Sequence, residues 1–165
     1  MTAQVDAFRL AATVLDEAGV LWWLSDGAVL GAVRDGRFVA TDPDVDLGVW
    51  AADMPTVRAA LAAAGWKLTR DRPGQVWAIH NGVKIDVHGH VRAGDRVRYE
   101  LARGRLAYQY PANLFDAFAP ATFHGVATRT PDPAEAYLTA HYGPDWRTPR
   151  ARWRWDIDPP CLIRL

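Results

Sequence analysis

Residues 44–50, with the sequence Asp-Val-Asp-Leu-Gly-Val-Trp, restrict the fold of this chain more than any other segment. Carboxylate and apolar side chains alternate along its first half, and alternation with a period of two indicates a β-strand. Side chains two residues apart in a strand leave the same face, so Asp44 and Asp46 should lie close together. Neighbouring carboxylates repel each other unless a cation neutralises them. The usual cation for an all-oxygen site is a hard divalent ion such as Mg²⁺, which often holds a substrate phosphate as well.

The segment before this strand suits an anion-binding turn. Residues 20–24 form an apolar run that predicts a core strand, and Asp26-Gly27 turns the chain after it. Gly27 lets the backbone approach a ligand closely because it has no side chain. Residues 28–35 predict a short helix whose first amide groups could face an anion.

A third carboxylate is expected on a later strand. The dipeptide Asn81-Gly82 is the strongest short hairpin signal in the chain, and it predicts a hairpin between residues 76–80 and 83–88. One face of the second arm is apolar, and its other face carries Lys84, Asp86 and His88. If this arm lies beside residues 44–50, Asp86 joins Asp44 and Asp46.

The rest of the chain predicts a mixture of helices and strands. Helices are expected over residues 3–18, 54–64 and 132–142, and a shorter one over 111–118. In the last long helix, Asp132 is expected as N-cap and Pro133 at the first helical position. Further extended segments are expected at residues 66–69, 75–80, 122–128 and in a hairpin over 96–109. The tail, residues 144–165, is expected to lack regular structure. Five tryptophans in apolar segments are expected in the core: Trp22, Trp23, Trp50, Trp66 and Trp77.

Composition limits the class of protein. The chain has 165 residues, of which 50% are hydrophobic, so a single domain over residues 1–165 with its own core is expected. Nineteen basic and nineteen acidic residues cancel, which argues against broad non-specific nucleic-acid binding but leaves a local basic groove open, and no nucleic-acid partner is expected. The single cysteine, Cys161, cannot form an internal disulfide. No apolar run approaches the roughly 20 residues that span a bilayer, so no transmembrane segment and a cytoplasmic location are expected.

Together these features indicate transfer of a phosphate-containing group. A glycine turn and a helix start can hold phosphate oxygens. Carboxylates can hold one or two divalent ions, Mg²⁺ or Mn²⁺, that neutralise developing charge and orient the attacking hydroxyl. This pattern is shared by the nucleotidyltransferase fold. The fold class expected is therefore α+β, with a small mixed β-sheet flanked by helices and an irregular C-terminal tail.

Residues 27–49, GAVLGAVRDGRFVATDPDVDLGV, carry a narrower resemblance. They resemble the signature of the LicD/fukutin family of phosphoryl-alditol and phosphocholine transferases. The resemblance continues at Ile85-Asp86-Val87, around Phe123, and at residues 142–149, where the family has a YG-x-x-W-x-x-P element. It covers nearly the whole chain from about residue 20, and three separated segments agree in order.

The resemblance implies a role for each matching residue. Asp44 and Asp46 would bind the metal, with Asp86 as the third carboxylate and a candidate base. Asp42 would assist the metal ligands or position the acceptor. The phosphate pocket would be shaped or contacted by Gly27, Gly31 and Arg34. His88 could add a metal ligand or a phosphate contact, or be an ordinary polar residue at a strand end.

The implied activity is that of a divalent-metal-dependent transferase. It would move phosphocholine or an alditol phosphate from a nucleoside-diphosphate donor, expected to be CDP-linked, to a sugar or glycan hydroxyl. Two alternatives stay open. One is transfer of a nucleoside monophosphate from a nucleoside triphosphate to a small molecule. The other is a catalytically degenerate nucleotide-binding module, which two departures from the family pattern favour: Ala28 for Thr or Ser, and Pro43 for Asp. Thr41 also stands where the family has Trp.

Several polar residues also have a purely structural interpretation. Asp42, Asp44 and Asp46 could belong to a solvated loop, and Asp86 and Arg34 could lie on the surface. In the tail, Trp146 and Trp153 could stack on a base or sugar, or pack onto the domain. The tail arginines could reach a diphosphate or be solvated: Arg147, Arg150, Arg152 and Arg154.

Overall fold

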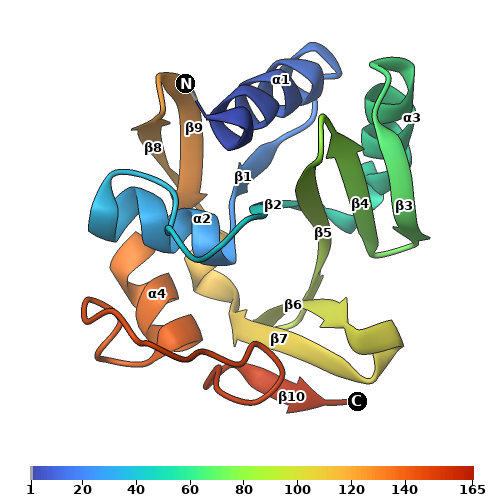
Figure 1. Cartoon of the computed structure of the whole chain (residues 1–165). Helices are drawn as coiled ribbons and strands as arrows, with labels where there is room; N and C mark the ends of the chain where they lie inside the picture. Colours follow the sequence, from blue (N-terminus) through green and yellow to red (C-terminus); the bar gives the residue numbers. More distant parts are fainter. Residues whose placement is uncertain (1) are drawn as a thin grey trace.

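The computed structural model describes residues 2–165 and has a mixed β-sheet flanked by helices, which confirms the expected fold class (Figure 1). The helices are α1 (Ala3–Glu17), α2 (Asp26–Leu30), α3 (Met54–Ala63) and α4 (Ala134–Tyr142), with short turns η1 (Gly31–Asp35), η2 (Ala51–Asp53), η3 (Ala102–Gly104) and η4 (Ala112–Phe115). The strands are β1 (Trp22–Leu24), β2 (Val45–Trp50), β3 (Lys67–Arg72), β4 (Gln75–His80), β5 (Val83–Ala93), β6 (Arg96–Leu101), β7 (Leu106–Pro111), β8 (Phe118–Phe123), β9 (Val126–Pro131) and β10 (Leu162–Arg164).

The long strand β5 organises the sheet, whose main order is β1-β2-β5-β6-β7-β10. Its first part lies between β2, which runs parallel to it, and the antiparallel strand β4. Its last three residues pair instead with β6, which continues into β7. The strands β8 and β9 form a separate hairpin. One strand thus connects the part of the sheet that carries the carboxylates to the β6–β7 hairpin.

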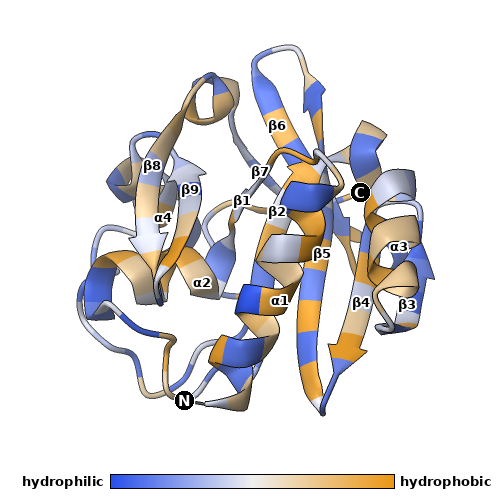
Figure 2. Cartoon of the chain, turned by 90° about the horizontal axis from the view of Figure 1, so that it is seen from above, coloured by the Kyte–Doolittle hydropathy of each residue, from blue (hydrophilic) through white to orange (hydrophobic). Residues whose placement is uncertain are grey.

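The pairing of β2 with β5 fixes the position of the predicted carboxylates. In this parallel pair Asp46 is opposite Asp86, and the apolar residues on either side of them are fully buried. Figure 2 shows this alternation along β5, with α1 lying across the sheet. Because side chains alternate along a strand, burying one face under α1 and α3 turns Asp46 and Asp86 to the opposite face. The prediction of a third carboxylate on a neighbouring strand is confirmed.

Helix α1 forms where the sequence predicts it, because its N-terminal cap and its buried apolar face both favour a helix. The side chain of Thr2 accepts a hydrogen bond from the amide of Val5, which caps the first turn. Phe8, Ala11 and Leu15 recur at helical spacing and have no exposed surface.

Within residues 2–165, no helix has both the length and the apolar character needed to cross a bilayer.

Gly48 is opposite Trp23 in the β1–β2 pair, and the indole covers it. A Cβ atom at this position would lie 2.1 Å from Trp23 Nε1 and 2.4 Å from Cε2. Trp23 is fully buried and stacks on Phe118 with ring centroids 4.6 Å apart, so it has little room to move. We expect Gly48→Ala to lower the free energy of unfolding by about 2–3 kcal/mol in urea denaturation.

A matched control for this substitution is Gly74→Ala. A Cβ atom at Gly74 would meet no heavy atom within 4 Å, and its backbone has no positive φ. We expect a change within about 0.5 kcal/mol there. Equal losses for the two substitutions would show that the packing of Trp23 on Gly48 is not the cause.

Three expectations about the C-terminal half and the core were wrong. The tail is not irregular throughout, because Leu162–Arg164 pairs with β7 as strand β10. Helix α4 has Pro133 rather than Asp132 at its N-cap, since the amide of Asp132 donates to the carbonyl of Leu114 and holds this residue against η4. Trp77 is only half-buried and lines a cavity instead of joining the core.

Candidate active site

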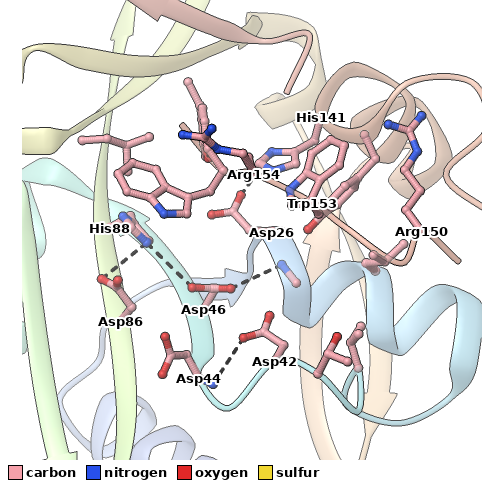
Figure 3. A pocket seen from close by; sticks show the side chains of 18 of the residues that line it. Asp26, Asp42, Asp44, Asp46, Asp86, His88, His141, Arg150, Trp153 and Arg154 are labelled. Atoms are coloured by element: carbon pink, nitrogen blue, oxygen red, sulfur yellow. Dashed lines mark hydrogen bonds and ion pairs between the residues drawn. The ribbon is translucent and has the colours of Figure 1, made fainter. Parts of the chain in front are cut away.

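A cavity of about 1460 Å³ lies on the polar face of β2 and β5. Figure 3 shows the carboxylates on one side of it and side chains of the C-terminal segment on the other. The start of α2, the loop before β2, and the strands β2 and β5 contribute the central carboxylates of the lining: Asp26, Asp42, Asp44, Asp46 and Asp86. Asp35 also lines the cavity, at the end of η1 and paired with Arg34. The predicted carboxylates therefore lie together in one cavity rather than on a solvated loop.

Asp46 lies at the centre of this group. Its Oδ2 accepts a hydrogen bond from the amide of Gly27 at 3.3 Å, and its Oδ1 is 3.9 Å from His88 Nε2. Burial raises the pKa of Asp46 to about 7, and the negative charges of Asp26 and Asp42 add to the rise. The Gly27 amide is thus already used by a carboxylate. An anionic Asp46 needs a positively charged partner in this place.

Asp44 and Asp42 lie on the loop side of the cavity. Asp44 Oδ2 is 2.6 Å from Lys84 Nζ, so a lysine neutralises this carboxylate. Asp42 Oδ1 accepts a hydrogen bond from the amide of Asp44 at 3.3 Å. Burial raises the pKa of Asp42 to about 6, and the charge of Asp44 contributes to the increase. A metal that used Asp44 would have to compete with Lys84.

Gly27 allows Asp42 to come close to the start of α2. A Cβ atom at Gly27 would lie 2.1 Å from Asp42 Oδ2 and 3.3 Å from Asp46 Oδ2. We expect Gly27→Ala to displace the Asp42 side chain and to reduce the activity of this site at least about 10-fold, as misplacement of a positioning group does. The far end of Asp42 can move, so the melting temperature should stay close to that of wild type. Gly74→Ala is again the control, and full activity in Gly27→Ala would contradict the close packing of Asp42.

Three hydrogen bonds hold the Asp86 carboxyl in one orientation. Gln75 Nε2 donates to both of its oxygens, at 2.9 and 3.1 Å, and Trp77 Nε1 donates to Oδ2 at 2.7 Å. The residue is only 7% exposed, so it does not lie on a solvent face. The same contacts explain why Trp77 lines the cavity instead of packing in the core. Its indole N–H binds the Asp86 carboxylate, and Arg70 and Lys84 lie over its ring.

Of the two neighbouring histidines on β5, His88 belongs to the site. Burial by itself would lower its pKa, but the charges of Asp86 and Asp46 raise the pKa of His88 to about 9. Its Nδ1 is buried and has no hydrogen-bond partner among residues 2–165. Burial and the charge of His88 lower the pKa of His90 to about 4, and the His90 ring packs on Trp23 and Tyr99. His90 is therefore a core residue.

Asp26 is a site residue that the sequence analysis missed. Its carboxylate accepts hydrogen bonds from the hydroxyls of Tyr99 and Tyr137, and His141 Nδ1 is 3.4 Å from Oδ1. Burial alone would raise its pKa, but the charges of His141 and His88 and the two hydroxyl donors lower the pKa of Asp26. The tyrosines lie 73 and 111 positions away in the sequence, so no local pattern indicates this contact. A φ of 41° at a non-glycine residue is an additional sign of a constrained functional position.

Asp26, Asp46 and His88 together could hold a metal ion. Each offers one ligand atom, and these atoms all lie within 4.8 Å of one another. Two carboxylates and one imidazole form a donor set that suits a divalent cation. The Nδ1 of His88 is buried without a hydrogen-bond partner among residues 2–165, so one nitrogen of this ring is not committed to another group. Asp46 belongs both to this cluster and to the carboxylate pair predicted from the sequence.

The other predicted residues lie at the edge of the site. Arg34 lines the cavity and pairs with the adjacent Asp35 through two contacts of 2.8 Å. Gly31 supports the loop before β2, because a Cβ atom there would lie 2.5 Å from the carbonyl oxygen of Arg37. The structure therefore places Arg34 within reach of a ligand and Gly31 beneath the loop.

The family described as LicD/FKTN/FKRP, nucleotidyltransferase domain, matches residues 19–132 of this sequence. The chain belongs to this family. All six carboxylates of the cavity lie within the matched residues, which confirms the resemblance read from the sequence. The identity of the family also agrees with the mixed sheet and with the glycine-containing start of α2 beside the acidic strand.

Curated relatives carry the names of ribitol-phosphate transferases. Mouse "Ribitol-5-phosphate transferase FKTN" is 29% identical over 94% of this chain and 35% of its own length. Human "Ribitol 5-phosphate transferase FKRP" is 28% identical over 82% of this chain and 30% of its own length. The chain thus spans about a third of the length of the curated relatives it matches.

Solved structures of antibiotic-modifying enzymes share the fold. ANT(2")-Ia in complex with adenylyl-2"-tobramycin has a TM-score of 0.63 at 18% identity, with 93% of this chain and 82% of that one covered. The lincosamide antibiotic adenylyltransferase LnuA, lincomycin-bound, has a TM-score of 0.59 at 18% identity, with 87% of each chain covered. These similarities confirm the nucleotidyltransferase fold.

Proposed function

We propose that this family member is a divalent-metal-dependent transferase. It moves a phospho-alcohol group, with an alditol phosphate favoured over phosphocholine, from a CDP-linked donor to a sugar or glycan hydroxyl. The observation that carries the proposal is the position of Asp46, which the parallel β2–β5 pair places between Asp26, Asp86 and His88 at the cavity floor. The names of the curated relatives support the alditol phosphate as the transferred group.

The donor set supports Mg²⁺ or Mn²⁺ as the cofactor. Asp46 would be the central ligand, assisted by Asp26 and His88 or, after release from Lys84, by Asp44. A bound divalent ion supplies charge neutralisation on the phosphate oxygens and orients the group that is displaced. Either arrangement requires Asp46, which makes it the residue on which the metal site depends.

The other side chains would orient the reactants. Asp86 is held in one orientation by Gln75 and Trp77, so it can complete the metal site or accept the proton of the acceptor hydroxyl. Asp42, beside Gly27, is a second carboxyl group suited to proton transfer near neutral pH, because burial raises its pKa to about 6. Arg34 would contact phosphate from the edge of the cavity.

The test is a direct assay of product release. CDP-ribitol, CDP-glycerol and CDP-choline are each incubated with the protein and a glycan acceptor, with Mg²⁺, with Mn²⁺ or with a chelator. We expect metal-dependent release of CMP and transfer of the phospho-alcohol, followed by ³¹P NMR, with the ribitol donor preferred. Release of pyrophosphate from nucleoside triphosphates instead would indicate nucleotidyl transfer. Binding of the nucleotides without any turnover would indicate a degenerate module.

A further inference from the structure

The C-terminal segment between α4 and β10, residues 143–161, forms the wall of the cavity that faces the carboxylates; we call it the C-terminal arm. Figure 3 shows Trp153, Arg150 and Arg154 of this arm across the cavity from the acidic side chains. The sequence left open whether Trp146 and Trp153 bind a ligand or pack onto the domain. The three tryptophans of the arm have different surroundings, and this difference identifies the one available to a ligand.

Two of the three tryptophans are used for packing. Trp146 is only 4% exposed and belongs to the core, with the guanidinium of Arg147 over its ring. Trp153 packs on Tyr142, with ring centroids 4.9 Å apart, and Arg150 lies over its ring at 5.3 Å. Both indoles therefore attach the arm to α4 and to the domain.

Trp155 is different. Its side chain is 53% exposed although it lines the cavity, and within residues 2–165 its ring has no stacking or cation–ring partner. Its backbone is nevertheless fixed, because its carbonyl oxygen accepts a hydrogen bond of 2.6 Å from Tyr108. The turn that follows is closed by the carboxylate of Asp158, which accepts from the amide of Arg154 at 2.6 Å. A large aromatic surface is thus held in place without a partner.

A row of aromatic rings leads from the candidate metal cluster to the residue that holds the Trp155 backbone. The ring of His88 lies 4.4 Å from that of Tyr99, which lies 5.4 Å from that of Tyr108, the residue that binds the Trp155 backbone. Both the carboxylates and the exposed indole of Trp155 line the cavity, so a ligand that contacts both needs one end suited to the metal site and one aromatic end. A nucleoside diphosphate has this form, with phosphates at one end and a planar base at the other.

The cavity also offers positive charge that the protein does not neutralise. The guanidinium groups of six lining residues have no carboxylate within 4.0 Å in the described part of the chain: Arg37, Arg70, Arg103, Arg105, Arg150 and Arg152. Arg70 is half-buried over the ring of Trp77, and the side chains of the other five are exposed. Guanidinium groups bind phosphate oxygens well because their donors match the spacing of the acceptors.

We propose that Trp155 is the stacking platform for the nucleobase of the donor, with the unpaired arginines of the cavity contacting its phosphates. The proposal rests on the proposed function and adds to it the place where the nucleoside binds. Because every base has a π-face, an exposed indole binds bases of different identity, and this contact does not select cytosine. Selectivity for the base would have to come from other groups.

Calorimetric titration of the full chain tests this assignment, with CDP and inorganic pyrophosphate as the two probes in the presence of Mn²⁺. We expect Trp155→Ala to weaken CDP binding about 5- to 100-fold, the usual range for loss of one base–aromatic stack. Trp155→Phe should restore most of the affinity, and both variants should bind pyrophosphate as wild type does. Because Trp155 is half exposed, the melting temperatures should agree.

The arginines are tested in the same titration. The pairs Arg103→Ala/Arg105→Ala and Arg150→Ala/Arg152→Ala should weaken CDP and pyrophosphate alike. The matched control is Arg147→Ala, because Arg147 belongs to the same arm but pairs with Glu135 outside the cavity lining. Unchanged CDP binding in Trp155→Ala, or an equal loss of pyrophosphate binding, would overturn the role of Trp155 while leaving the proposed function intact. If wild type bound no CDP and released no CMP, the proposed function itself would be wrong.

Discussion

Replacing Asp46 with asparagine should abolish metal-dependent release of CMP while making the metal-free protein more stable. Asp46 belongs to both proposed sets of metal ligands, so the variant lacks a metal-binding carboxylate in either case. The loss of activity is therefore expected to be at least about 1000-fold. The gain in stability follows from burial, which raises the pKa of Asp46 to about 7. The folded protein therefore bears a free-energy cost for ionising this group that the neutral amide does not have.

The sign of the pH dependence follows from the same shift. The unfolded chain ionises Asp46 near its usual value of 3.8, whereas the folded chain does so at about 7. Wild type should therefore lose stability relative to Asp46→Asn as the pH rises from about 4 to about 7. Thermal unfolding in chelator at several pH values measures this, with a difference of about 2–4 °C expected for each 1 kcal/mol.

Asp44→Asn is the matched control for Asp46→Asn. Asp44 and Lys84 are partly exposed, with side-chain exposures of 30% and 23%, so loss of their ion pair should cost no more than about 1 kcal/mol. Asp44→Asn should thus destabilise slightly, where Asp46→Asn stabilises. A metal-free Asp46→Asn protein that melts below wild type would show that the carboxylate is stabilising, contrary to its raised pKa.

Replacing Asp26 with asparagine should have the opposite effect on stability. Tyr99 and Tyr137 donate hydrogen bonds to this buried carboxylate, and the charges around it lower its pKa. An asparagine presents an N–H group to one of these hydroxyls and cannot accept both bonds as strongly. We expect a loss of about 2 kcal/mol or more in urea denaturation at neutral pH with chelator present.

The stabilisation by Asp26 should depend on pH in the reverse sense to that of Asp46. Because its folded pKa lies below the unfolded value of 3.8, the stabilisation is present above that pH and is lost as the protein is acidified. Tyr137→Phe removes one donor and should reproduce part of the loss. Equal stability of wild type and Asp26→Asn at neutral pH would contradict the charge-dependent network.

The sequence was sufficient for the part of the fold that carries the acidic site. Alternation in residues 44–50 and the Asn81-Gly82 turn predicted β2 and β5, because a buried apolar face fixes which way the polar side chains point. The resemblance to the family then supplied the roles of these residues. Those roles stay predictions, but the structure does place Asp44, Asp46 and Asp86 together in the lining of one cavity.

Other features depended on contacts between distant segments. Asp26 looked like a turn residue, and only the docking of β6 and α4 brings Tyr99 and Tyr137 onto it. The strand β10 has three residues, too few for a periodic pattern, and forms because the edge of β7 is available. Trp77 sits in an apolar segment, and the carboxylate of Asp86 on the neighbouring strand draws its indole N–H to the cavity.

The pairing of β10 with β7 also changes the entropy of ligand binding. The arm starts at the end of α4 and ends in the sheet, so it is a loop closed at both ends rather than a free tail. A closed loop explores far fewer conformations than a tail of the same length. A ligand that settles between the arm and the carboxylates therefore loses little affinity to ordering the chain, because folding has already restricted the wall that it meets.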